Sequence, residues 1–388
     1  MTFARTAPMV MAIVGVSALS AGAVQAQLMI TGNDEKVIFT PEGKPRYLPP
    51  DRDTVSIVDI GTDPADPKIV ANLHLKNSVF GPPTNLAITP DQKLALVANS
   101  MKWVQGEGWW VPKPGNELHV IDLSSGDPRL VRTMNVGDQP SGMAISPDGK
   151  LALIANRNGH SISVLSIDGT TVKPIGTVAM EAQVSAVAIT PDGKRALATK
   201  FADHKVSLLS IDGQTVTYDG TDLPVGLWPY NVAITPDGKL GLTADNGNAG
   251  SSDGHVDTVS VIDLEATPPR VIDHVVVGDA PEGLAVSPTG EIAVAILLNG
   301  TGGVPEDAWY YNPHGLVAVL AIEGKTLRVI DKVAVGGLPE GVVFSPDGGY
   351  LYVGNFVDGD VSILKVDGTT VTNTGKTLKL PGHPGSMR

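Results

Sequence analysis

Residues 140–149, Pro-Ser-Gly-Met-Ala-Ile-Ser-Pro-Asp-Gly, decide the fold of this chain. The stretch combines a Pro-X-Gly turn, a short apolar strand and a Pro-Asp-Gly turn. Variants of the first turn begin at positions 83, 140, 184, 229, 281, 339 and 384, and the first six are followed by a second turn at 89, 146, 190, 235, 287 and 345. Repeats of about 40 to 50 residues that hold several short strands are typical of β-propeller blades.

One repeat contains four strand signals. Gly142–Ser146 is a short apolar run that fits an innermost strand, and Leu151–Asn156 follows the Pro-Asp-Gly turn as a second strand. Ser161–Ile167 alternates polar and apolar residues, and the Asp-Gly pair at 168–169 predicts a tight hairpin to an outer strand from Thr171 onward. The same hairpin signal recurs at 212–213, 323–324 and 367–368. Each blade should therefore be a four-stranded antiparallel sheet.

The two ends of the chain predict how the ring closes. Leu28–Thr31, Thr54–Ile60 and Lys68–Leu75 resemble the second, third and fourth strands of a blade that lacks a first strand. Pro384–Arg388 can supply it, which would remove the open sheet edges that invite aggregation. We therefore expect an all-β fold, a single seven-bladed propeller over residues 27–388.

A second interpretation of the N-terminal region stays open. Val37–Thr40 with the turn Pro41-Glu42-Gly43 could be an inner strand and its turn. The C-terminal tail would then begin an eighth unit or hang free.

The first residues predict export. Arg5, the apolar run Ala7–Leu19 and small residues up to Ala26 have the layout of a signal peptide over residues 1–26, and the run is too short to span a bilayer. An uncleaved interfacial anchor is the alternative. The chain contains no Cys, so neither disulfides nor thiol chemistry are expected in the periplasm or the medium. A formal charge of −13 without a basic cluster argues against nucleic acid and membrane insertion.

A resemblance to a known family rests on one repeat. The strand Leu351-Tyr352-Val353-Gly354-Asn355, followed by Val361-Ser362-Ile363-Leu364 and combined with the Ser/Thr-Pro-Asp-Gly turns, resembles the YVTN-type β-propeller repeat family, which is grouped with lactonase-like seven-bladed propellers. The resemblance covers residues 28–388, although Ala198-Thr199-Lys200 departs from the pattern. Members include lactone hydrolases and proteins without known chemistry, so it implies a fold and leaves activity open.

Long connections are expected on one face of the disc. Segments 33–53, 100–116, 246–255 and 299–314 all join strands or blades on that face, and they carry four of the five Trp residues. The predicted ligand-binding aromatics are Trp109, Trp110, Trp228, Tyr230, Trp309, Tyr310 and Tyr311. Such residues could form a contact surface for a ligand, or they could form small hydrophobic clusters that hold the long loops in place. Trp228 is expected to pack against the protein itself.

Titratable residues are expected at the mouth of the central channel. Glu282 and Glu340 occupy the same turn position in adjacent blades, so they could act as acid and base or hold a hard divalent cation. A purely structural role for both carboxylates is the alternative. Arg157 and Lys200 could bind an anionic group of a substrate, and His314, beside two tyrosines, is a tentative catalytic residue.

Two functions fit these features. The first is a monomeric binding module that captures a small molecule, a glycan or a protein on the aromatic-rich face. The second is a lactone or ester hydrolase that uses Glu282 and Glu340 beside Arg157. The sequence shows no Gly-Xaa-Ser-Xaa-Gly elbow and no Gly-rich phosphate loop, and we predict no cofactor.

Overall fold

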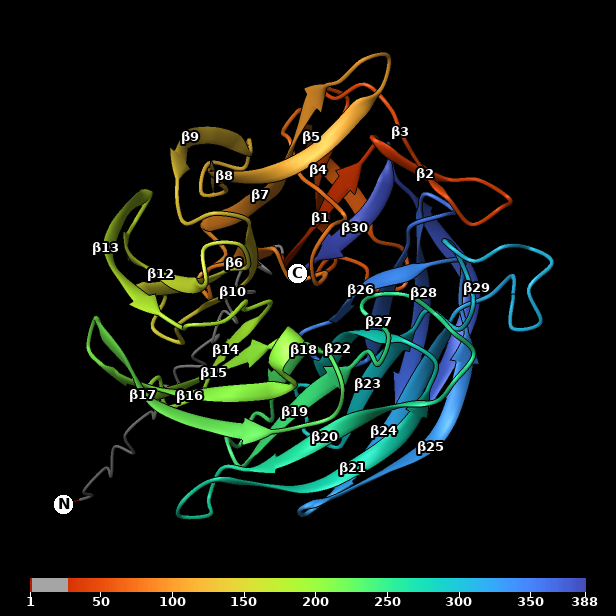
Figure 1. The fold of residues 1–388 in the computed structure, drawn as a ribbon. Helices are drawn as coiled ribbons and strands as arrows, with labels where there is room; N and C mark the ends of the chain where they lie inside the picture. The colour runs from red at the N-terminus through yellow and green to blue at the C-terminus, as the bar shows by residue number, and fades with distance from the viewer. Residues whose placement is uncertain (2–26) are drawn as a thin grey trace.

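The computed structural model describes residue 1 and residues 27–388, so the predicted signal peptide at 1–26 lies almost entirely outside the described residues. The described chain forms seven four-stranded antiparallel sheets arranged around a central axis (Figure 1). This confirms the predicted seven-bladed β-propeller. Within each blade the strands follow one another from the axis outward, so each loop lies at one of the two faces of the disc.

Blades are numbered from the first one whose four strands follow one another in the sequence. Blade 1 holds β6 (Leu86–Ile88), β7 (Leu94–Gln105), β8 (Trp110–Asp122) and β9 (Arg129–Asn135); blade 2 holds β10 (Pro140–Ile145), β11 (Leu151–Asn156), β12 (Ser161–Asp168) and β13 (Thr171–Ala179); blade 3 holds β14 (Val187–Ile189), β15 (Arg195–Lys200), β16 (Lys205–Asp212) and β17 (Thr215–Pro224); blade 4 holds β18 (Pro229–Ile234), β19 (Leu240–Asp245), β20 (Asp257–Asp263) and β21 (Arg270–Gly278).

The remaining strands complete the ring. Blade 5 holds β22 (Pro281–Val286), β23 (Ile292–Leu297), β24 (Leu316–Glu323) and β25 (Thr326–Ala334); blade 6 holds β26 (Pro339–Phe344), β27 (Tyr350–Asn355), β28 (Asp360–Asp367) and β29 (Thr370–Lys379); blade 7 holds β30 (His383–Met387), β1 (Leu28–Asp34), β4 (Thr54–Asp59) and β5 (Lys68–Leu73).

Blade 7 is built from both ends of the chain, as the sequence predicted. The innermost strand β30 pairs antiparallel with β1, with Gly32 opposite Ser386. The alternative placement of Val37–Thr40 as an inner strand is wrong, because β2 (Val37–Phe39) pairs only with β3 (Pro45–Tyr47) in a separate two-stranded hairpin. That hairpin is an insertion between the second and third strands of blade 7.

The two recurring turn motifs have different physical roles. In the second motif, Ser146 Oγ accepts a hydrogen bond from the Leu151 N–H and donates to Asp148, while Gly149 adopts the positive φ that closes the turn. In blades 2, 4, 5 and 6 the first motif is the start of an inner strand and not a turn, because β10, β18, β22 and β26 begin at its Pro residue. In blade 1 the motif does lie in a turn, ahead of β6. A Cβ atom at Gly142 would lie 2.7 Å from the Ala186 Cα of the next blade. Glycine is therefore needed there for close approach at the axis.

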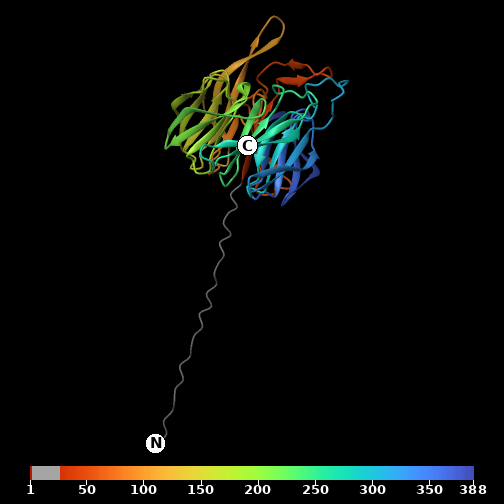
Figure 2. The same ribbon diagram turned by 60° about the horizontal axis from the view of Figure 1, so that its bottom comes forward.

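The connection at 100–116 differs from the predicted loop. Strands β7 and β8 continue through it as a paired hairpin, with Trp103 opposite Pro112 and Gln105 opposite Trp110. Met101 pairs with Pro114 nearer the blade, and the hairpin turns at Gly106–Gly108. Figure 2 shows it standing out from the side of the disc that also carries the β2–β3 hairpin.

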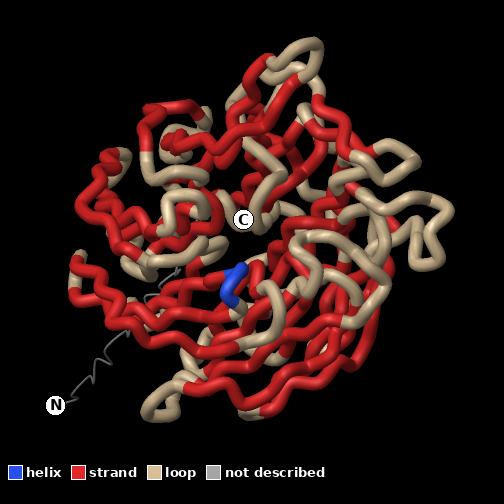
Figure 3. Tube along the Cα trace, in the orientation of Figure 1, coloured by secondary structure: helices blue, strands red, loops and turns tan. Residues whose placement is uncertain are grey.

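The hydrophobic core lies between neighbouring blades. One cluster packs Leu96 and Leu118 of blade 1 against Ile154 and Leu165 of blade 2, and similar clusters follow around the ring. Strands dominate the trace in Figure 3, with one short 3₁₀ helix, η1 (Phe201–Asp203), drawn in blue. Among residues 27–388, no helix is long and apolar enough to cross a membrane.

Candidate functional site

A ring of seven side chains surrounds the axis where the inner strands begin. One residue comes from each blade, and all are buried: Thr84, Ser141, Ser185, Tyr230, Glu282, Glu340 and Ser386. Contacts join several of these positions. Ser185 Oγ donates to the Tyr230 backbone oxygen at 2.9 Å, and burial raises the pKa of Tyr230, which the nearby Glu282 and Glu340 carboxyl groups raise further.

Glu282 of β22 and Glu340 of β26 form a pair of buried carboxyl groups. Their side chains are 5% and 4% exposed, and the two carboxyl groups lie close enough to affect each other's pKa. Burial raises the pKa of both groups, and the neighbouring carboxyl raises the pKa of Glu340 further. Two such carboxyl groups share one proton over a wide pH range, so the pair offers one acid and one base.

Arg157 provides a positive charge beside this pair. Its guanidinium lies 4.7 Å from the centre of the Phe201 ring and 5.6 Å from that of Tyr230. Cation–π contacts on these rings hold the side chain in place. The charge of Arg157 opposes the burial effect on the pKa of Glu282, so Glu282 is the carboxyl that ionises more readily.

An amide from the 246–255 connection completes the contacts of Glu282. Asn246 Nδ2 donates to Glu282 Oε1 at 3.4 Å, and Asn246 Oδ1 accepts from the Gly250 N–H at 2.5 Å. Sequence reasoning missed Asn246 and Phe201. Both directly follow a second strand of their blade, a position that faces the channel mouth, and this signal could have identified them.

Three adjacent positions of the ring carry oxygen atoms without hydrogen-bond partners. Glu340 Oε2, Ser386 Oγ and Thr84 Oγ1 come from blades 6, 7 and 1 and are unpaired within the described part of the chain. Buried polar atoms are rarely left unpaired in native proteins. This side of the ring therefore favours an additional hydrogen-bonding molecule, such as water or a polar ligand.

Two other predicted site residues lie apart from the pair. The Lys200 Nζ atom donates to the Tyr218 hydroxyl at 2.8 Å and forms an ion pair with Asp222 at 3.1 Å. The lysine is thus engaged within blade 3. His314 is exposed on the 299–314 connection, where its backbone oxygen accepts from Asn299 Nδ2 at 2.9 Å.

The predicted aromatic residues divide into separate groups. Trp228 packs edge-on against Phe201 with 5.3 Å between ring centres, as expected, and Trp309 packs against Tyr310 at the same separation. Trp109 and Trp309 are 62% and 78% exposed, whereas Trp110 and Tyr311 are half-buried. The expectation that these aromatics sit in loops is wrong for Trp110, which begins β8, and for Tyr230, which lies in β18.

The described residues contain no group of three or more His, Cys, Asp or Glu side chains positioned to hold a metal ion. A divalent cation at the Glu282–Glu340 pair remains a prediction.

Comparisons with known proteins identify the fold. No family model matches the sequence, and no curated protein matches it. The chain is similar in structure to a putative 6-phosphogluconolactonase from Bacteroides fragilis, with a TM-score of 0.71, 16% identity and coverage of 95% of this chain and 99% of the other. It is also similar to the periplasmic gluconolactonase PpgL of Pseudomonas aeruginosa, with a TM-score of 0.66, 20% identity and coverage of 93% and 99%.

A third similar structure carries no assigned activity. It is a functionally unknown protein from Desulfotomaculum acetoxidans, with a TM-score of 0.67, 15% identity and coverage of 94% of this chain and 98% of the other. At these identities the likeness shows a lactonase-like seven-bladed propeller fold. The finer resemblance to the YVTN repeat has no support from a family model.

Proposed function

We propose that the axial cluster hydrolyses a lactone, with Glu282 and Glu340 as base and acid. The observation that supports this proposal most strongly is the pair of buried carboxyl groups that affect each other's pKa, beside the Arg157 guanidinium. General acid–base catalysis needs groups that hold opposite protonation states at the same pH. A proton shared by the pair meets that requirement.

The proposed reaction assigns one role to each carboxyl group. Glu282, whose ionised form Arg157 favours, takes a proton from a water molecule that attacks the lactone carbonyl carbon. Glu340, whose pKa is raised further, donates its proton to the ring oxygen as the carbon–oxygen bond breaks. The new hydroxy acid leaves, and the proton returns from Glu282 to Glu340 through their mutual contact.

Arg157 and the unpaired oxygens define the substrate class that we propose. The guanidinium would stabilise the negative charge that develops on the carbonyl oxygen. Ser386 and Thr84 offer hydroxyl groups to a substrate that carries hydroxyls of its own. One similar structure is a putative 6-phosphogluconolactonase and another is a periplasmic gluconolactonase, so a polyhydroxylated sugar lactone is the first class to test.

Export and partner binding also remain proposals. One similar protein, PpgL, is a periplasmic gluconolactonase, which agrees with the predicted signal peptide and with a periplasmic or secreted protein. Binding of a glycan or protein partner would involve the exposed Trp109 and Trp309, because the other predicted aromatics have more of their surface buried.

The decisive experiment measures ring opening of glucono-δ-lactone and of simple aliphatic lactones, after subtraction of the spontaneous rate. We expect catalysis by the natural chain and a loss of about 100-fold or more in Glu282→Gln and in Glu340→Gln. Glu323→Gln, an exposed carboxyl paired with Arg328, is the matched control and should retain full activity. Equal rates in all four proteins would rule the proposal out.

A further inference from the structure

A cavity away from the axis has the features of a second binding site. It has a volume of about 470 Å³ and lies between blade 7 and blade 1, under the extended β7–β8 hairpin. Its lining includes Asp53, Asn99, Trp103, Trp110 and Glu117. This volume is in the range of small-molecule sites.

The indole walls of the cavity are held by packing. Trp103 is 9% exposed, and its ring lies 6.0 Å from the ring centres of both Tyr47 and Phe80. Trp110 opens the partner strand and is only half-buried. Rigid aromatic faces of this kind suit the apolar faces of a ring-shaped ligand, because little entropy is lost when they bind.

Polar atoms at the same walls lack partners. Asn99 is 1% exposed, its Nδ2 atom donates to Glu117 Oε2 at 3.0 Å, and its Oδ1 atom has no hydrogen-bond partner among the described residues. The Trp103 Nε1 atom likewise has none. The Asn99 Oδ1 acceptor and the Trp103 Nε1 donor thus lack partners. A hydroxyl group can satisfy either atom, because it both donates and accepts a hydrogen bond.

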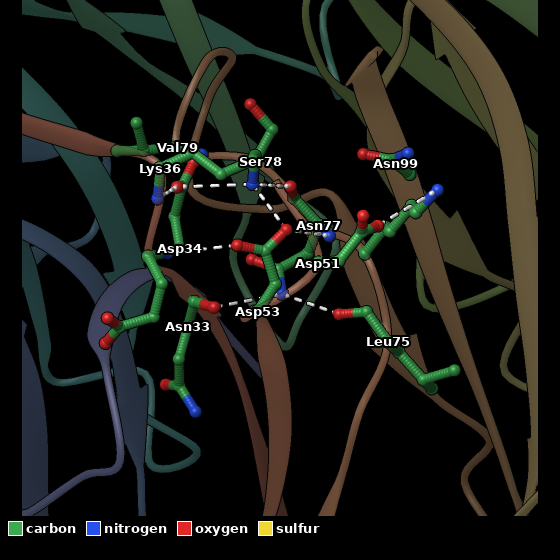
Figure 4. A network of polar contacts seen from close by, with 12 residues as sticks. Asn33, Asp34, Lys36, Asp51, Asp53, Leu75, Asn77, Ser78, Val79 and Asn99 are labelled. Atoms are coloured by element: carbon green, nitrogen blue, oxygen red, sulfur yellow. Dashed lines mark hydrogen bonds and ion pairs between the residues drawn. The ribbon is translucent and has the colours of Figure 1, made fainter. Parts of the chain in front are cut away.

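The charges that line the cavity cancel. The lining includes three lysines and three acids, Lys36, Lys76, Lys102, Asp51, Asp53 and Glu117, of which Lys102 and Glu117 form no ion pair among the described residues. Lys36 is buried and pairs with Asp34 and Asp53, as Figure 4 shows together with Asn99 on the neighbouring strand. Lys76 pairs with Asp51 at 3.4 Å. Lys36 and Lys76 already have acidic partners, so a charged ligand would find no free counter-ion in these pairs. This favours a neutral ligand.

We infer that this cavity binds a neutral polyhydroxylated ring, such as a monosaccharide. The site is independent of the proposed lactone hydrolysis, because none of its lining residues belongs to the axial ring. Two insertions build it, the segment after β1 and the β7–β8 extension, so it is an addition to the basic propeller.

Calorimetric titration with glucose, galactose and myo-inositol tests the inference, with glucuronate and glucosamine as charged analogues. We expect saturable binding of at least one neutral compound and binding of its charged analogues weakened by about tenfold or more. Trp110→Ala should weaken binding by about tenfold, while Val104→Ala, whose side chain is exposed on the same hairpin and does not line the cavity, should leave binding unchanged.

A second variant guards against a folding artefact. Asn116→Ala removes another lining side chain at less structural cost and should also weaken binding while the melting temperature stays within a few degrees. Absence of saturable binding by the natural chain would overturn the inference. So would binding that survives both Trp110→Ala and Asn116→Ala, or binding that is lost only in Glu340→Gln, which would place the sugar at the axis.

Discussion

Thr31 of β1 lies opposite Met387 of β30, so the beginning and the end of the described fold share one sheet. The Met387 N–H also donates to the Pro83 oxygen at 3.3 Å, which ties the closing blade to blade 1. Ring closure therefore depends on a short strand with contacts on both sides.

Met387→Ala should destabilise the protein strongly. The side chain is fully buried in a cluster with Met29 and Tyr352, so truncation leaves a cavity at the closure. We expect a loss of about 2 to 5 kcal/mol in the free energy of unfolding, measured by urea denaturation. Val276→Ala, at a 57% exposed position, should change it by less than about 0.5 kcal/mol. Similar values for both variants would contradict the closure described above.

The inner-strand glycines predict a second effect on stability. A Cβ atom at Gly341 would lie 2.6 Å from the Met387 nitrogen, and this nitrogen belongs to backbone that cannot move aside easily. Gly341→Ala should therefore cost about 1 to 3 kcal/mol, read from thermal or urea unfolding. Gly176→Ala is the control, because its nearest neighbour is Val164 Cβ at 3.9 Å and its φ is not positive. A neutral Gly341→Ala variant would show that the blades are less tightly packed at the axis.

Most of the fold was predictable because it repeats. The hairpin glycines at 169, 213, 324 and 368 all adopt positive φ between third and fourth strands, as their Asp-Gly or Glu-Gly signals indicate. Single insertions carry no such repetition. Residues 100–116 have Gly and Pro residues typical of a loop, yet pairing with the already formed β7–β8 ladder extends both strands through them.

The candidate site was predictable only in part. Glu282 and Glu340 were found because they occupy equivalent positions of neighbouring repeats. The sequence could not show that Lys200 is engaged away from the candidate site. Its partner Asp222 lies on the outer strand β17, and a β-bulge shifts the register of that strand against β16. Asn246 and the lateral cavity depend on how insertions fold back on the disc, and no local pattern encodes such contacts.

Lys36→Met tests the buried charges beside the lateral cavity. Lys36 is 2% exposed and donates to Asp53 and to the Asn77 oxygen, and burial already raises the pKa of Asp53. Removal of the lysine charge leaves Asp34 and Asp53 without compensation, so we expect a loss of about 3 to 5 kcal/mol in the free energy of unfolding. Lys239→Met, which breaks an exposed pair with Asp237, should cost less than about 1 kcal/mol. Equal costs would mean that the buried triad contributes no more than a surface pair.

The shared proton of Glu282 and Glu340 predicts a specific dependence of stability on pH. Their raised pKa values mean that the folded state holds a proton which the unfolded chain releases at about pH 4.3. The corresponding stability is fully present below that pH and is lost as the pH rises toward the folded pKa, by up to about 1.4 kcal/mol per pH unit.

Glu340→Gln removes this titration because an amide stays neutral and its N–H can donate to Glu282. The free energy of unfolding of the variant minus that of the natural chain should therefore rise by about 2 kcal/mol between pH 5 and pH 7, measured by urea denaturation in matched buffers. Other titrating groups are common to both proteins and cancel in this difference. A difference that stays constant, or that falls with pH, would show that the two carboxyl groups do not share a proton in the folded protein.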